Sequence, residues 1–314
     1  MLKLYKDYRL GGEARYLLCN KGEKPMMVPD ETRKCVAFVG CKNNDEKIRF
    51  GGTCFFASIP LGIDNFNFNY CITAKHVIEM IKKNSIDQKV YLRFNTKDGG
   101  IQIIPTPIEN WLSHPNDLAV DVAALFSPMP YPEMDYKRIP YSMMASEKII
   151  KSEGIGIGDE VFIAGLFANH FGEKKNLPIL RIGNIAMMPE EKIFSQELGL
   201  IDAYLIEARS IGGLSGSPVF AHLAGVRYQD GESHIIPGRF FFIGLIHGHW
   251  DVPIDKQDDI FIEDFLKNER INMGIAIVIP TYKILEVLNQ NTFLQKREEI
   301  KKKIQEKKSP TLDS

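Results

Sequence analysis

Three segments of the sequence carry the residue types that nucleophilic catalysis needs. Thr73-Ala-Lys-His76 places a histidine after a strand-like run, and Asp117-Leu-Ala-Val-Asp121-Val-Ala-Ala-Leu enters a strand through acidic residues. Gly212-Gly-Leu-Ser215-Gly-Ser-Pro sets a serine in a glycine-rich turn. A nucleophilic serine needs a base to take its proton, and the base needs a carboxylate to fix its tautomer. The glycines allow backbone N–H groups to converge on a developing oxyanion. These segments therefore predict acyl-transfer chemistry.

Two overlapping motifs compete for the role of the carboxylate. Asp117 and Asp121 lie four residues apart, so in a regular strand both side chains would point to the same face. An apolar strand, Val-Ala-Ala-Leu-Phe, follows Asp121, and a charge within a strand needs a buried partner, which His76 would supply. Asp117 belongs to the loop-like Ser-His-Pro-Asn-Asp. The sequence favours Asp121 and leaves Asp117 as the alternative.

The elements that must position these groups are short strands. Most of the chain consists of runs rich in β-branched or aromatic residues, bounded by Gly, Pro, Asn and Asp. This rhythm predicts an all-β barrel or sandwich, and a Pro-rich connection within 127–158 divides two strand-rich halves. Helical patterns are limited to a short segment after His76 and a longer one after Pro280. The expected strands are Lys34–Val39, Phe50–Ile59, Asn69–Thr73, Lys89–Phe94, Val120–Phe126, Glu160–Leu166, Ala203–Glu207, Pro218–Ala221, Arg239–Ile246 and Gly274–Ile279.

Together the three motifs resemble those of the trypsin-like, chymotrypsin-fold serine peptidases. TAKH at 73–76 corresponds to the family's TAAH, DVAAL at 121–125 to its D-[IV]-A-L strand, and GLSGSP at 213–218 to its GxSGxP. The chain order His, Asp, Ser is also the family's, with gaps of 45 and 94 residues. The resemblance implies an all-β fold of two six-stranded antiparallel β-barrels with a C-terminal helix.

The resemblance spans about residues 35–289 and implies a division of the chain. Barrel one would cover about 35–130, barrel two about 158–280, and a closing helix 281–289. Residues 1–34 would form an N-terminal extension, and 290–314 a charged C-terminal helix or tail.

The resemblance also implies a role for each motif residue. Ser215 would attack a peptide carbonyl, His76 would accept its proton and deliver it to the leaving amine, and Asp121 would orient the imidazole. The backbone N–H groups of Gly213 and Ser215 would form the oxyanion hole. No cofactor is implied, because the nucleophile and the base are both side chains. A zinc site at His-Gly-His 247–249 is not expected, because no Cys or carboxylate lies at helical spacing from it.

Two positions depart from the secreted members of that family. Leu214 stands where zymogens carry the Asp that pairs with the new N-terminus, and Val77 stands where a cysteine follows the histidine. Both departures resemble the prokaryote-like, intracellular branch and imply that the chain is not activated by zymogen cleavage.

Two further residues are candidates for substrate binding. By analogy with the fold, the S1 pocket would be walled by the segments around Arg209 and around His247. His247 falls beside the position at which glutamate-selective relatives carry a histidine, although Ile246 occupies that position itself. A pocket lined by an unpaired Arg209 would prefer an acidic or amide-bearing P1 side chain. In the alternative, Arg209 pairs with Glu207 or another carboxylate and points to solvent.

Composition limits the remaining function classes. Thirty-nine Lys and Arg against 40 Asp and Glu give a net charge of −1, which offers no global field for nucleic acid or an anionic membrane. Apolar runs such as Phe240–Ile246 are far shorter than the ~20 residues of a transmembrane helix. The first residues lack the apolar core of a signal peptide, and five cysteines without a CxxC pair predict reduced thiols. Within these limits, the resemblance implies a cytoplasmic protease acting on a peptide or protein; a catalytically silent peptide-binding or adaptor module is the alternative.

Overall fold

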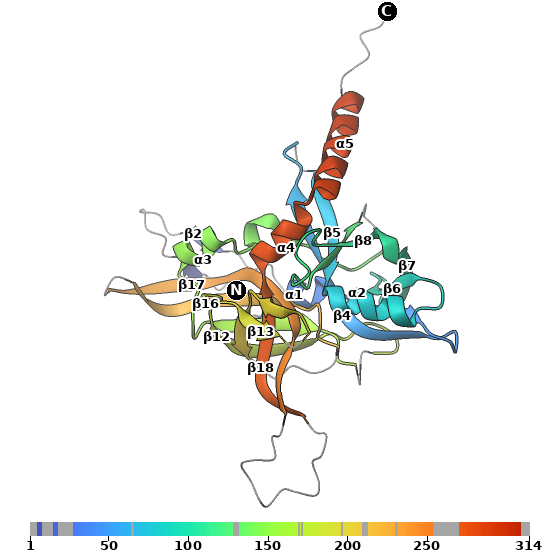
Figure 1. The fold of residues 1–314 in the computed structure, drawn as a ribbon. Coiled ribbons are helices and arrows are strands. Elements are labelled where there is room, and N and C mark those ends of the chain that lie inside the picture. The colour runs from blue at the N-terminus through green and yellow to red at the C-terminus, as the bar shows by residue number, and fades with distance from the viewer. Residues whose placement is uncertain are drawn as a thin grey trace, which may run out of the picture.

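The protein is mostly β, with a curled sheet and a closed barrel packed against each other and helices at the C-terminal end (Figure 1). The computed structural model describes residues 5–7, 15–17, 28–63, 66–127, 132–168, 170, 172–195, 197–208, 213–229, 232–253 and 270–308. The expectation of an all-β, chymotrypsin-like fold is confirmed.

The first sheet contains eight strands. Its hydrogen-bonded path runs β7–β6–β3–β4–β5–β9–β8 with antiparallel neighbours, and β10 pairs with β4 in parallel. The strands are β3 (Val36–Lys42), β4 (Ile48–Pro60), β5 (Asn67–Thr73), β6 (Lys89–Asn95), β7 (Ile101–Pro107), β8 (Trp111–Ser113), β9 (Ala123–Ser127) and β10 (Ile139–Pro140).

In the described residues, the first sheet curls without closing into a ladder between β7 and β8. Pro105 and Pro107 lack a backbone N–H, which suits β7 to an edge position. The 3₁₀ turn η1 (Ile108–Asn110) leads directly from β7 to β8, and Trp111 Nε1 donates to Thr106 Oγ1 at 3.0 Å across this corner. The first half is therefore a curled half-barrel, where the resemblance implies a closed six-stranded barrel.

The second half is a closed barrel of six strands, as the resemblance implies. Its order is β11–β12–β15–β18–β17–β16, and a small hairpin of β13 and β14 lies between β12 and β15 along the chain. The strands are β11 (Glu160–Gly165), β12 (Ile179–Met187), β13 (Ile193–Ser195), β14 (Gly199–Ile201), β15 (Tyr204–Glu207), β16 (Pro218–Gln229), β17 (Glu232–Pro253) and β18 (Arg270–Pro280).

An apolar core joins the two halves. The larger of two buried clusters contains side chains from the first sheet and from β11, β16, β17 and β18 of the barrel. Phe55 of β4 meets Phe242 of β17 with ring centroids 5.0 Å apart, and Phe220 of β16 lies 5.9 Å from Phe242. Removing such rings from water is the main source of folding free energy, so this core fixes one half against the other.

The helices surround the sheets. The helices expected beside His76 and after Pro280 are both present, as α2 and α4; His76 lies inside the first turn of α2. The helices are α1 (Glu31–Lys34), α2 (Lys75–Asn84), η2 (Tyr141–Met143), α3 (Glu147–Glu153), α4 (Thr281–Leu288) and α5 (Asn291–Lys308).

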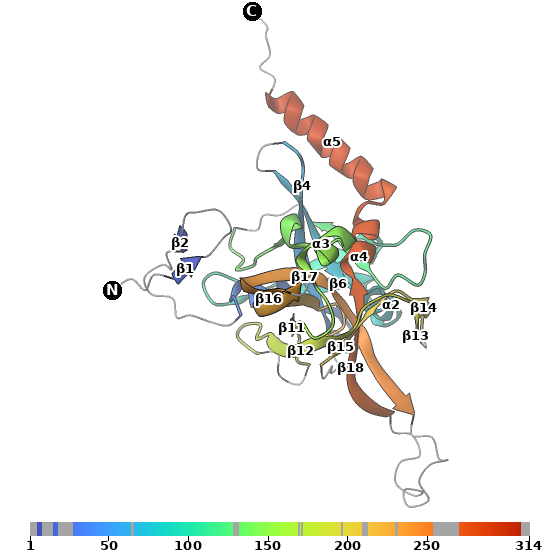
Figure 2. The same ribbon diagram turned by 90° about the vertical axis from the view of Figure 1, so that its left-hand side faces the viewer.

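The two ends of the chain add smaller elements. At the N-terminal end, β1 (Tyr5–Asp7) and β2 (Arg15–Leu17) form a two-stranded sheet. At the other end, α5 extends away from the sheets (Figures 1 and 2), anchored by buried Phe293 and by Arg297, whose Nε donates to Tyr70 Oη at 2.7 Å.

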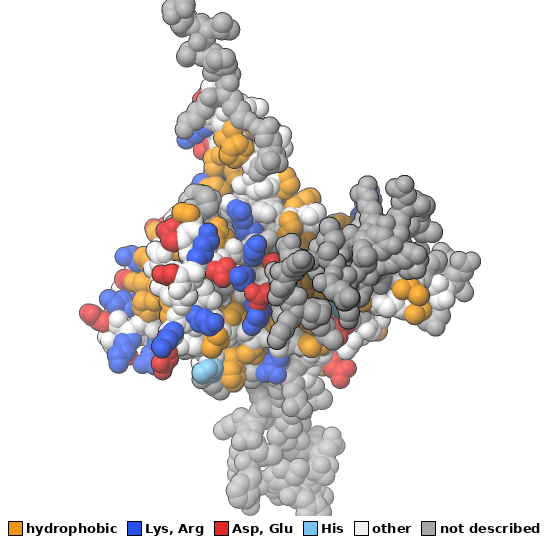
Figure 3. Space-filling model, turned by 180° about the vertical axis from the view of Figure 1, so that it is seen from behind, with side chains coloured by type: hydrophobic (Ala, Val, Ile, Leu, Met, Phe, Trp, Pro, Cys, Tyr) orange, Lys and Arg blue, Asp and Glu red, His pale blue; other side chains and the backbone are white. Residues whose placement is uncertain are grey.

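The surface matches the near-zero net charge. On the face shown in Figure 3, acidic and basic side chains are interspersed rather than gathered into a patch of one sign. None of the helices in the described ranges combines the length and the apolar character needed to cross a membrane.

Candidate active site

His76 is held at the start of α2 by the carboxylate of Asp121. Its ring Nδ1 lies 2.7 Å from Asp121 Oδ2, and its backbone N–H donates to Asp121 Oδ1 at 2.9 Å. Backbone N–H groups in the first turn of a helix have no partner within the helix, so the carboxylate acts there as a cap. One carboxylate thus fixes both the backbone and the ring of His76.

Strand pairing within the first sheet brings these two residues together. Thr73, the last residue of β5, pairs with Ala123, the first residue of β9. His76 follows the one strand and Asp121 precedes the other, so both lie at the same edge. Asp121 is fully buried, and His76 is partly exposed.

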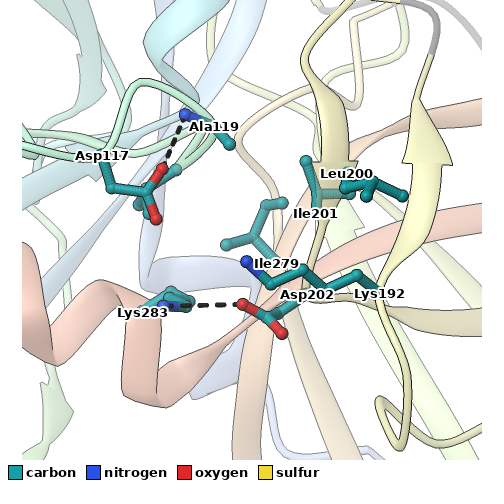
Figure 4. A pocket seen from close by; sticks show the side chains of 9 residues that line it. Asp117, Ala119, Lys192, Leu200, Ile201, Asp202, Ile279 and Lys283 are labelled. Atoms are coloured by element: carbon teal, nitrogen blue, oxygen red, sulfur yellow. Dashed lines mark hydrogen bonds and ion pairs between the residues drawn. The ribbon is translucent and has the colours of Figure 1, made fainter.

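Asp117, the alternative carboxylate, lies elsewhere. Its Oδ1 accepts from the backbone N–H of Ala119 at 3.0 Å, which closes the turn before β9. It lines a small pocket with Lys192 and with the Lys283–Asp202 ion pair (Figure 4). The structure therefore joins His76 to Asp121 and places Asp117 in a separate polar cluster.

Electrostatics favour an ionised Asp121 beside a basic His76. Burial alone would raise the pKa of Asp121, but hydrogen bonds from His247 and His76 outweigh it and hold that pKa well below 3.8. Burial lowers the pKa of His76, yet the hydrogen bond to Asp121 and its charge raise it above 6.5 overall. Because an ionised carboxylate can only accept, His76 Nδ1 carries the proton and Nε2 is left to act as a base.

The Ser215 turn connects β15 to β16 and reaches across to the first sheet. Ser215 O accepts from the N–H of Thr53 at 3.0 Å, and Gly216 N donates to Ile246 O at 2.8 Å. Gly216 has φ +82°, and a Cβ there would lie 2.2 Å from Thr53 O and 2.3 Å from Thr73 Oγ1. Only glycine allows this approach, which places the serine turn against the residues that lead into α2.

Thr53 of β4 links the two halves beside this turn. Its buried hydroxyl donates to Gly213 O at 2.8 Å and accepts from the N–H of Leu166, also at 2.8 Å. Its own carbonyl accepts from Thr73 Oγ1 at 2.7 Å. Thr53 thus ties the backbone on both sides of the site into one hydrogen-bonded chain.

His247 of β17 completes the cluster. Its side chain is 6% exposed, its Nδ1 lies 2.5 Å from Asp121 Oδ2, and its Nε2 lies 3.4 Å from Ser195 Oγ. Its carbonyl accepts the hydroxyl of Ser215 at 3.3 Å, and its ring meets that of His76 edge-on, with centroids 5.5 Å apart. The residue that the sequence predicts in a substrate pocket therefore lies with its ring against Asp121.

Sequence reasoning missed these contacts. His247 and Asp121 are 126 residues apart, and Ser195 is 52 residues from His247, so no local spacing signals either contact. The available signal was a histidine within an apolar strand, whose buried ring needs a polar partner. Arg209, the other predicted pocket residue, lies outside the described residues.

The composition of this cluster also suits a metal ion. One ligand atom from each of His76, Asp121 and His247 lies within 4.8 Å of the others. The two Nδ1–Oδ2 separations are hydrogen-bond lengths, however, whereas ligands around tetrahedral zinc stand about 3.3 Å apart. The geometry is therefore that of a hydrogen-bonded cluster, which a metal would have to push apart.

Comparison with known proteins finds distant structural likenesses. No family model matches the chain, and no curated protein matches it either. Among solved structures, it is similar to Deg5, with 15% identity and a TM-score of 0.45, over 81% of this chain and 87% of that one. It is also similar to an inactive form of a serine-to-alanine mutant of Rv3671c from M. tuberculosis H37Rv, with 16% identity and a TM-score of 0.43, over 84% of this chain and 96% of that one. The function must therefore be argued from the site itself.

Proposed function

We propose that this protein is a serine endopeptidase that uses Ser215 as nucleophile, His76 as general base and Asp121 as the orienting carboxylate. The observation that carries the proposal is the hydrogen-bonded pair of His76 and Asp121, in which the buried carboxylate binds both the ring Nδ1 and the backbone N–H of the histidine. The glycine-rich turn of Ser215 is pressed against the same edge of the first sheet. A base held in one tautomer next to a serine turn is the arrangement that activates a hydroxyl.

The reaction follows from these positions. Ser215 Oγ attacks the carbonyl carbon of the peptide while its proton passes to Nε2 of His76, and Asp121 stabilises the imidazolium that forms. The backbone N–H groups of Gly213 and Ser215 receive the developing oxyanion; Gly213 has φ +98°, a conformation open to glycine. His76 then protonates the leaving amine, and water hydrolyses the acyl-enzyme by the reverse proton transfers.

The serine hydroxyl must turn before it reacts. In the structure Ser215 Oγ donates to the carbonyl of His247 rather than to Nε2 of His76. Hydrogen bonds in unliganded active sites are often longer or differently directed than in the complex with substrate. Rotation of the serine side chain towards His76 is therefore part of the proposed cycle. We also propose that Arg209 lines the S1 pocket and makes the enzyme prefer substrates with an acidic or amide-bearing P1 side chain.

The same hydrogen bond favours a second candidate function. A protein that holds an extended peptide without cutting it could keep Ser215 directed at the carbonyl of His247. Such a catalytically silent module would have the pair of His76 and Asp121 but no turnover.

Labelling with a fluorophosphonate separates the two functions. We expect one label per chain, located by peptide mass spectrometry on Ser215, and its loss in Ser215→Ala and His76→Ala. Ser217→Ala is the matched control, because Ser217 lies in the same turn but is fully buried, and its hydroxyl has no hydrogen-bond partner among the described residues. A folded wild-type protein that takes up no label and cleaves no peptide would contradict the endopeptidase and favour the binding module.

The proposed P1 preference is tested with a fluorogenic library varied at P1. Fastest cleavage after Glu, Asp or Gln, reduced in Arg209→Ala without loss of fluorophosphonate labelling, would support it. Fastest cleavage after Arg, Lys or a bulky apolar residue would contradict it.

A further inference from the structure

Two imidazoles share one oxygen of the buried carboxylate. Nδ1 of His76 and Nδ1 of His247 lie 2.7 Å and 2.5 Å from Oδ2 of Asp121. The proposed reaction gives a task to His76 but none to His247, which comes from the other half of the molecule and is more deeply buried. A polar ring is costly to bury, so its direction towards this one oxygen requires an explanation.

The hydrogen-bond pattern fixes the tautomer of both rings. Asp121 is fully buried and ionised, so it only accepts, and both Nδ1 atoms must donate to it. In its neutral form His247 is left with Nε2 as an acceptor, and this atom faces Ser195 Oγ at 3.4 Å. A hydroxyl can donate to it, so Ser195 supports the same tautomer of His247. Ser195, His247, Asp121 and His76 thus form one continuous chain of polar contacts.

Ser195 cannot serve as a second nucleophile in this chain. It is 5% exposed and belongs to β13, where it pairs with Gly199 of β14. A substrate carbonyl could not reach its hydroxyl without opening the hairpin. Its contact with His247 therefore suits orientation rather than attack.

We infer that His247 is a positioning residue that acts through Asp121, an inference that rests on the proposed function. Its Nδ1–H holds Oδ2 in place so that Oδ1 stays aligned with the backbone N–H of His76. Its carbonyl meanwhile holds the hydroxyl of Ser215. One residue of the second barrel therefore contacts both the carboxylate of the first sheet and the serine turn, and sets their relative position.

The charges around the base decide the direction of the expected pH effect. His76 faces Asp121, the His247 ring, Glu79 of its own helix and Glu197 of the β13–β14 hairpin. Without the Nδ1–H of His247, the carboxylate of Asp121 has one hydrogen-bond donor fewer. Its negative charge then stabilises protonated His76 more strongly. The pKa of His76 should rise, and the acid limb of kcat/KM should move to higher pH.

The test compares His247→Ala, His247→Asn and Ser195→Ala in the full chain. We expect His247→Ala to lower kcat by about 10- to 100-fold with KM changed less than about twofold, because a misplaced catalytic group costs rate rather than binding. His247→Asn, whose amide places a donor near the position of Nδ1, should recover most of the loss. Ser195→Ala should act in the same direction but only by about threefold.

His222→Ala is the matched control. His222 also directs Nδ1 at a carboxylate, Glu160 Oε2 at 2.9 Å, and its side chain is largely buried. It lies on β16, however, and its partners lie on β11 and β17, outside the site. It should leave kcat, KM and the acid limb unchanged. Equal loss in His222→Ala and His247→Ala would show a general packing effect and would overturn the inference.

Two outcomes separate positioning from a substrate pocket. A rise in KM alone in His247→Ala, with kcat and the acid limb unchanged, would assign His247 to substrate binding and overturn the inference. Wild-type rates in His247→Ala would do the same while leaving Ser215 labelling, and so the proposed function, intact.

An NMR titration tests the coupling without activity. Two strongly hydrogen-bonded imidazole N–H protons are expected at low field in the wild type, and His247→Ala should lose one and raise the pKa of His76. If the wild type takes up no fluorophosphonate label, the proposed function is contradicted. The titration still decides whether His247 acts on His76 through Asp121, because an unchanged pKa of His76 in His247→Ala would overturn that coupling.

Discussion

The two halves of the molecule contribute to the site in different ways. The first sheet supplies His76 and Asp121 from neighbouring strands, so ordinary backbone pairing of β5 with β9 aligns the base and its carboxylate. The barrel supplies Ser215 on a turn whose position depends on contacts that cross to the first sheet, above all those of Thr53. The positions of His76 and Asp121 are thus fixed within one sheet, whereas the position of Ser215 is fixed by the interface between the first sheet and the barrel. Substitutions at His76 or Asp121 should abolish the reaction, whereas substitutions at the interface should shift Ser215 relative to His76 and slow the reaction.

The largest effect is expected within the first sheet. Asp121→Asn should lower kcat by about 10⁴-fold, because an amide no longer imposes the Nδ1–H tautomer on His76 or stabilises its charged form. Asp117→Asn is the matched change four residues away, in a turn without contact to His76. We expect less than about a threefold effect there, measured as kcat on the same peptide. The reverse ranking of the two variants would show that Asp117, not Asp121, serves the base.

A smaller effect is expected at the interface. Thr53→Val keeps the shape of the side chain but removes the hydroxyl that donates to Gly213 O and accepts from Leu166 N–H. The serine turn and its oxyanion donors should shift, which we expect to lower kcat/KM by about 10- to 100-fold. The free energy of unfolding should fall by about 1–3 kcal/mol, because two buried backbone groups lose their partner.

Thr281→Val separates these two consequences. Thr281 is also buried, and its hydroxyl also donates to a backbone carbonyl at 2.8 Å, that of Phe242. It should lose about half as much stability in chemical denaturation, because one buried backbone group loses its partner instead of two, but keep the activity of the wild type. If both variants lose activity in proportion to stability, the interface has no special role in aligning the serine.

The difference between the halves also explains what the sequence could predict. The His76 and Ser215 motifs are local, and the apolar strand after Asp121 needs a partner for the charge at its entry, so all three stand out from residue types and spacing alone. Five of the six strands of the second barrel, all except β12, and the α4 helix also follow from periodicity and turn residues.

The contacts made across the interface could not be predicted in this way. Neither the shared oxygen of Asp121 nor the contact of Ser195 with His247 has a counterpart in local spacing. Closure of the first sheet, which the family resemblance implies, depends on how the edges β7 and β8 meet, where Pro105 and Pro107 lie. These features are decided by tertiary packing, which a pattern of single residues does not record.

The smallest effect tests how far the barrel tunes the base held by the first sheet. The pKa of His76 is lowered by burial but raised overall above 6.5 by Asp121, with smaller contributions from Glu197 and then Glu79. Because the neutral imidazole is the base, kcat/KM should rise with pH through that raised pKa.

Glu197→Gln removes a negative charge that favours protonated His76, so the acid limb of the kcat/KM profile should move to lower pH by a few tenths of a unit. The shift should be larger at low salt, because Glu197 is exposed. Glu79→Gln, also exposed and paired with Lys75 at 3.7 Å, should move it less. Profiles of kcat/KM from pH 5 to 9 at two ionic strengths would measure both shifts, and a larger shift in Glu79→Gln would place the control of the base within its own helix rather than in the barrel.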